Sequence, residues 1–164
     1  MKRIISIVLC AIILALPLAS CGRPSGDPVE TSQRDAYLEN RKKFLESDLY
    51  RDAVDYLTTV FSELLPGAET DFSLEPGSID AAELERYSGF AGDTELRKEL
   101  FSLLDLSVRT NYWEFPEEDP MEIGSRLIDK GITLRLMAGP AGADYFDVDA
   151  KAGTCTLVNV PEAN

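Results

Sequence analysis

Two stretches of the chain repeat apolar residues at the spacing of an amphipathic helix. The first ends at Pro66-Gly67, and its apolar positions are Leu49, Ala53, Val54, Leu57, Val60, Phe61, Leu64 and Leu65. The second follows a capping residue at Asp93 or Thr94, and its apolar positions are Leu96, Leu100, Phe101, Leu103, Leu104 and Val108. Residues three and four apart share one face of a helix, so each stretch predicts a helix that packs on a core.

The residues before and between these stripes predict further boundaries. Ser32, with Asp35 three residues later, predicts the cap of an earlier helix. The pattern leaves open whether Ser47-Asp48 separates that helix from the first stripe. Residues 68–77 are acidic and contain Pro-Gly, which predicts a loop, and Ser78 then predicts the cap of a short helix.

The clearest helix ends lie in the last third of the chain. Asp119 is a favourable N-cap, Pro120 suits the first helical position, and Glu122 is placed to complete a capping box. Gly131 suits the residue just after a helix. The sequence therefore predicts a helix between Pro120 and Lys130.

Apolar and polar residues alternate after Gly131, as in half-buried strands. Residues 132–137, 145–149 and 154–160 each show this pattern, and Gly- and Asp-rich turns separate them. The predicted class is α+β, with N-terminal helices packed on a C-terminal three-stranded antiparallel meander.

The first twenty residues have a different pattern. Lys2 and Arg3 precede an apolar run from Ile4 to Leu16, which is shorter than the ~20 residues that span a bilayer, so a cleaved signal peptide is predicted. The leader ends in Leu18-Ala19-Ser20-Cys21, which resembles the lipobox of bacterial lipoproteins.

That resemblance implies a lipid-anchored protein. It implies cleavage after Ser20, diacylglycerol with fatty acids such as palmitate on the Cys21 thiol, and an extracytoplasmic domain held at the cell membrane. Two or more acyl chains make such attachment stable. The expected organisation is a signal peptide over 1–20, a flexible tether over 21–31, and a single domain over 32–164. Gly22 is not the Asp that retains many lipoproteins in the inner membrane, so an outer-membrane position is allowed.

Charge narrows the range of partners. The chain has 16 basic and 29 acidic residues, and without Lys2 and Arg3 its net charge changes from −13 to −15. Nucleic acids and anionic headgroups are bound mainly through Lys and Arg, so nucleic acid is not an expected partner. The expected partner is an envelope protein or a glycan.

The chain lacks the residues that several kinds of catalytic, metal and cofactor sites require. The chain has no histidine, which excludes histidine-activated nucleophiles and zinc sites that need imidazole. No cofactor-binding motif occurs, so we expect no cofactor. Asp147, Asp149 and Gly153 have the spacing of a calcium loop, but Lys151 stands at a ligand position, which favours a turn. Cys155 is expected to be a buried thiol in a strand.

One segment combines aromatic and acidic residues between two predicted helices. Tyr112, Trp113 and Phe115 form a candidate partner surface. The alternative, which we favour for Trp113 and Phe115, is that these two side chains pack on the core. The nearby carboxylates are Glu114, Glu117, Glu118 and Asp119. The predicted function is a non-enzymatic binding module of the cell envelope. The alternative is a hydrolase in which a pair of these carboxylates cleaves glycans.

Overall fold

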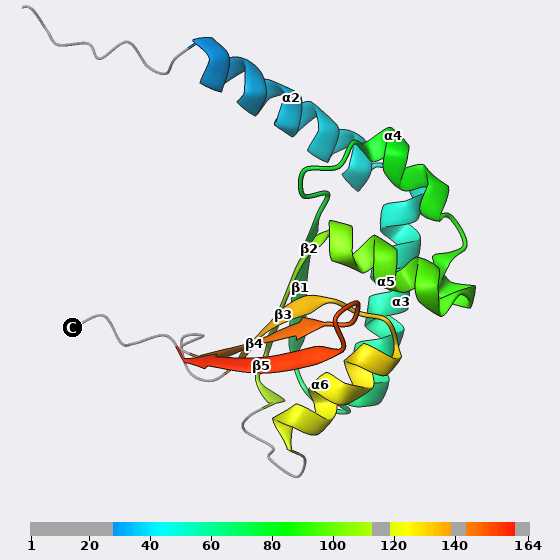
Figure 1. The fold of residues 1–164 in the computed structure, drawn as a ribbon, viewed down its shortest axis with the longest axis vertical. Helices are drawn as coiled ribbons and strands as arrows, with labels where there is room; N and C mark the ends of the chain where they lie inside the picture. The colour runs from blue at the N-terminus through cyan, green and yellow to red at the C-terminus, as the bar shows by residue number, and fades with distance from the viewer. Residues whose placement is uncertain (1–27, 113–118, 139–143, 160–164) are drawn as a thin grey trace, which may run out of the picture. The chain divides into compact units, whose positions relative to one another are not determined.

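A computed structural model of the chain describes residues 28–112, 119–138 and 144–159 (Figure 1). The chain separates into two compact units, residues 1–34 and residues 35–164. The first helix, α2, begins at Pro28 in the first unit and ends at Leu45 in the second. The second unit contains the sheet and the hydrophobic core.

The first two strands of this unit lie between helices, and the last three strands follow one another. The helices after α2 are α3 (Asp48–Leu64), α4 (Ala81–Leu84), α5 (Thr94–Leu103) and α6 (Pro120–Asp129), with 3-10 turns η1 (Glu85–Tyr87) and η2 (Phe90–Gly92). The strands are β1 (Thr70–Glu75), β2 (Asp105–Thr110), β3 (Leu134–Ala138), β4 (Asp144–Asp149) and β5 (Thr154–Asn159).

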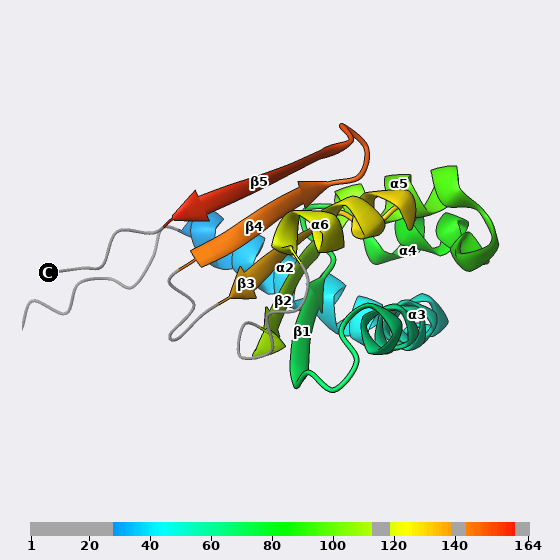
Figure 2. The same cartoon turned by 90° about the horizontal axis from the view of Figure 1, so that it is seen from below.

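The five strands form one mixed sheet in the order β1-β2-β3-β4-β5. β1 and β2 are antiparallel, β2 and β3 are parallel, and β4 and β5 each pair antiparallel with the preceding strand. A parallel pair needs a crossover connection, and α6 lies in the connection from β2 to β3. Figures 1 and 2 show α3, α5 and α6 on the same side of the sheet.

Alternation along the strands separates a covered face from an open face. Leu106 and Val108 of β2, Leu136 of β3, and Phe146 and Val148 of β4 are buried. The register places these side chains on the same face of the sheet. The core also contains Leu57 and Phe61 of α3, Phe101 of α5, and Ile123 and Leu127 of α6.

The predicted three-stranded antiparallel meander is wrong, although the α+β class is correct. The sheet has five strands, is mixed, and begins before α5 rather than after all the helices. Residues 70–75 were expected in a loop and form β1. The second stripe was expected to stay helical to Thr110, but α5 ends at Leu103 and β2 begins at Asp105.

Two of the predicted helix caps are confirmed. Asp93 accepts hydrogen bonds from Glu95 N–H and Leu96 N–H at 2.9 and 3.1 Å, and Asp119 accepts one from Met121 N–H at 2.9 Å. Ser47 caps α3, so the chain does break there.

Two other cap predictions are wrong. Ser32 lies inside α2 and is not its cap, and Asp80, not Ser78, caps α4. The Glu122 carboxylate, expected to complete the capping box of α6, accepts from Arg126 at 2.9 Å.

Candidate functional site

The open face of the sheet carries most of the polar side chains of the strands. We define it by Asp71, Asp105, Arg135, Tyr145 and Thr154, together with every second residue that follows each of them in its strand. The strand register aligns these residues in rows across the sheet.

The middle row places an arginine at the centre of the face. Ser73, Ser107, Arg135, Asp147 and Thr156 are successive cross-strand neighbours in this row. The Arg135 Nε donates a hydrogen bond to Asp147 Oδ1 at 3.1 Å, and the two side chains are 54% and 47% exposed. An ion pair this exposed adds little to stability, so both groups remain available to a partner.

Arg135 also contacts the neighbouring row. Its guanidinium carbon lies 4.6 Å from the centroid of the Tyr145 ring, a cation–π contact. The hydrogen bond to Asp147 raises the pKa of Arg135 above its usual value. The charge of Asp147 and, to a smaller extent, Tyr145 and Asp105 act in the same direction, whereas burial opposes the shift. The guanidinium is therefore held in place and permanently charged.

The same neighbouring row is partly apolar. Met137, Tyr145 and Val158 are cross-strand neighbours on β3, β4 and β5, and each is half-buried. Arg109 precedes Met137 in the row, on β2. The open face thus combines a short apolar strip with two arginines, a composition typical of protein–protein interfaces.

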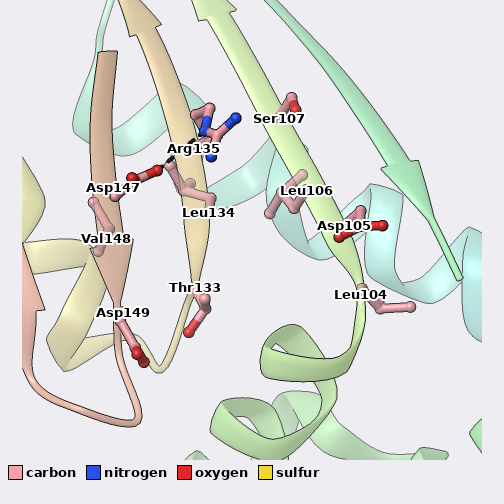
Figure 3. A pocket seen from close by; sticks show the side chains of 10 residues that line it. All are labelled: Leu104, Asp105, Leu106, Ser107, Thr133, Leu134, Arg135, Asp147, Val148 and Asp149. Carbon is pink, nitrogen blue, oxygen red and sulfur yellow. Dashed lines mark hydrogen bonds and ion pairs between the residues drawn. The ribbon is translucent and has the colours of Figure 1, made fainter. Parts of the chain in front are cut away.

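A hollow of about 470 Å³ opens beside Arg135, near the first residues of β2 and β3 (Figure 3). Its polar lining includes Ser107 and Thr133, and Asp147 and Asp149 from β4. Asp105 lines it from β2, so the hollow is lined by three carboxylates and one guanidinium. This excess of negative charge favours a cationic side chain over an anionic one.

The lining of this hollow combines polar and apolar side chains. It offers hydroxyl groups, carboxylates and one guanidinium, but no cysteine, histidine or lysine. Within the part of the chain that the structure describes, no group of three or more Cys, Asp or Glu side chains could hold a metal ion.

Of the three aromatic residues of the candidate partner surface, the structure describes Tyr112. Tyr112 is 6% exposed and belongs to the core, and its N–H donates to Thr110 Oγ1 at 3.1 Å. It was expected on the partner surface, and this assignment is corrected because its ring packs with other apolar groups. Trp113 and Phe115 lie outside the described residues.

The carboxylates of the hydrolase alternative divide in the same way. Glu114, Glu117 and Glu118 lie outside the described residues, as does the lipid-attachment residue Cys21. Asp119 is described, and its carboxylate caps α6.

The calcium-like residues form a turn, as expected. Asp149 Oδ1 accepts hydrogen bonds from Lys151 N–H at 2.9 Å and Ala152 N–H at 3.0 Å. Gly153 completes the turn with a φ of 70°, which glycine adopts without strain. Asp147 belongs to the open face and pairs with Arg135.

Cys155 is half-buried, so the prediction of a buried thiol is only partly confirmed. It packs against the core, and desolvation by the surrounding protein raises its pKa. A raised pKa leaves less reactive thiolate at neutral pH.

Sequence alternation could have suggested part of the open face. Arg135 lies between two predicted inward-facing residues, Leu134 and Leu136, so its outward direction follows from period two. Its pairing with Asp147 depends on the β3–β4 register, which alternation alone does not give.

No protein-family model matches the chain, and no curated protein or solved structure matches it. Among residues 28–112, 119–138 and 144–159, no helix is both long enough and apolar enough to cross a membrane. The function is therefore argued from the geometry of the open face and from the leader sequence.

Proposed function

We propose that the protein is a lipid-anchored bacterial envelope protein whose domain binds another envelope protein through its open face. The anchor is Cys21, on the basis of the Leu18-Ala19-Ser20-Cys21 motif. The binding role is non-enzymatic. The observation that supports it is the exposed arrangement of Arg135, Asp147 and Tyr145 at the centre of the open face.

These three side chains have the properties of a binding hot spot. Tyr and Arg are enriched among residues that contribute most to protein interfaces. The contacts with Tyr145 and Asp147 orient the Arg135 guanidinium before a partner arrives, which lowers the entropy cost of binding. The half-buried side chain of Met137 adds apolar area beside them.

The experiment is crosslinking of the full chain in native membranes, followed by quantitative recovery of its partner. Arg135→Ala should reduce recovery about tenfold or more, because it removes a hot-spot side chain. The control is Arg51→Ala, since Arg51 also forms an exposed ion pair, with Asp48, but lies on α3. Arg51→Ala should leave recovery unchanged.

Two results would contradict the proposal. Equal recovery with both variants would remove the open face as the binding surface. Recovery that disappears after glycan digestion, with no protein crosslinked, would indicate a glycan ligand.

The hydrolase alternative gains no support from the described residues. Asp119 is the member of its carboxylate group that the structure describes, and this carboxylate already accepts the Met121 N–H at the start of α6. Glycoside hydrolysis needs two carboxyl groups at a defined separation across a cleft, and the other members of the group lie outside the described residues.

A further inference from the structure

One edge of the sheet is formed by a strand without any charged residue. β5 is the last strand in the sheet order and has the sequence Thr-Cys-Thr-Leu-Val-Asn. In the described part of the chain it pairs only with β4, so alternate N–H and C=O groups point away from the sheet. Such an edge is a template for another strand, and charged residues are a common protection against this pairing.

The opposite edge has that protection. β1 carries Asp71 and Glu75 on its open-face side, and Arg41 of α2 hydrogen-bonds Glu75 with its Nη2 at 2.7 Å from Oε1. An added strand at β1 would meet two carboxylates and a helix side chain. The two edges of the same sheet are thus chemically different, and β5 is the open one.

Apolar side chains accompany the backbone groups of β5 on both faces. Leu157 is 49% exposed on the covered face, and Met121, at the start of α6, is 45% exposed. α6 packs against β5, and the two elements run in opposite directions in Figure 1. On the open face, Val158 continues the strip formed by Met137 and Tyr145 out to the edge.

We propose that β5 pairs antiparallel with β5 of a second copy of this chain across a two-fold axis. The pairing would join two five-stranded sheets into one ten-stranded sheet, a size that natural sheets reach. With the axis at Thr156, this residue would lie opposite its own copy, and Leu157 would lie opposite Cys155 across the new pair. Both open faces would then lie on the same side of the combined sheet.

Charge favours a second copy over other extended partners. A charged segment, basic or acidic, would find no residue of opposite charge on β5. An identical strand is uncharged, so no like charges meet across the new pair. The nearest carboxylates on the open face, on β4, would be about 14 Å from their copies, which is beyond the ~8 Å screening length in physiological salt.

The experiment measures the mass of the full chain, isolated from membranes in mild detergent, by sedimentation over a range of concentrations. The parent chain should be a dimer that dissociates on dilution. Thr156→Lys should abolish the dimer, because Thr156 is exposed on β5 and two lysines would face each other across the axis. Thr156 lies opposite Asp147 of β4, so the lysine is compatible with the folded monomer.

The matched control is Ser73→Lys, which adds the same charge to an exposed open-face position of the β1 edge. This variant should remain a dimer. Thr156→Glu should be monomeric by itself, and mixing it with Thr156→Lys should restore a dimer through opposite charges. Restored pairing would also show that both variants are folded, and neither change affects the lipid anchor.

The proposal is overturned if the parent chain is monomeric at every concentration. It is also overturned if Thr156→Lys dimerises as strongly as Ser73→Lys, because the contact would then lie elsewhere. A monomeric parent whose partner recovery is lost in Thr156→Lys would mean that a different protein occupies β5.

Discussion

The backbone of α6 lies very close to the sheet at a glycine. A Cβ atom built on Gly124 would lie 2.3 Å from the Cys155 Sγ and 3.1 Å from its Cβ. A residue larger than glycine at position 124 would not allow the α6 backbone to lie this close to Cys155. The same contact explains why desolvation raises the thiol pKa.

Gly124→Ala should lower the free energy of unfolding by about 1–3 kcal/mol, because overpacking forces α6 away from β5. Cys155→Ala removes the atom at 2.3 Å, so the double variant should lose less stability than the sum of the two single variants. Urea denaturation of the four proteins gives this coupling. Gly92→Ala is the control, since an added Cβ there meets nothing within 4 Å. Strict additivity would contradict the steric explanation.

At the scale of single residues, the sequence does not reveal contacts between residues that lie far apart along the chain. The strand position of Cys155 was predictable, but its partner Gly124 lies 31 positions earlier and nothing local marks the pair. Tyr112 shows the same limit, because an aromatic residue beside carboxylates suits a core or a surface equally well. For Arg135, the outward direction of the side chain was predictable, but its pairing with Asp147 was not.

At the scale of whole elements, the sequence predicts the starts of helices better than it predicts the strands. Asp119 and Pro120 define the start of α6, and Asp93 that of α5, as the sequence predicts. The missed strands have physical reasons. Asp71, Ser73 and Glu75 suggest a loop because these residues are poor strand formers, and they are accepted in β1 because they face outward. β2 was missed because Val108 continues the helical spacing of the second stripe.

The cap of α6 provides a test that also separates the two candidate functions. Asp119→Ala should lower the free energy of unfolding by about 1 kcal/mol, because the Met121 N–H loses its acceptor. Asp119→Asn should stay within a few tenths of the parent value, since asparagine caps equally well. Chemical denaturation measures both. If Asp119→Asn were fully stable but lost a glycan-cleaving activity, the carboxylate would be catalytic and the non-enzymatic proposal wrong.

For the whole molecule, the anchor is the property on which localisation depends. Cys21→Ser should leave the leader attached and the protein without lipid, because the Cys21 thiol is the acceptor that the lipobox resemblance implies. Intact-mass measurement of protein from membranes checks this result. Cys155→Ser is the matched control and should be processed normally. A parent chain with an unmodified N-terminal residue other than Cys21 would contradict the anchor.

The architecture as a whole was only partly predictable. The α+β class follows from helical stripes followed by alternating segments, and the structure has this class. The five-stranded mixed sheet was not predicted, because the parallel β2–β3 pair joins segments separated by α6. Pairing across such a distance depends on the folded core rather than on any local signal.

The spatial order of the strands is the same as their order along the chain. No strand therefore has to insert between two that are already paired, and each new strand adds to the edge left by the previous one. A chain that emerges from a ribosome or a translocation channel with its N-terminus first can build this sheet vectorially. The strand that completes it is β5, so the uncharged edge forms only after the other four strands of this sheet have emerged.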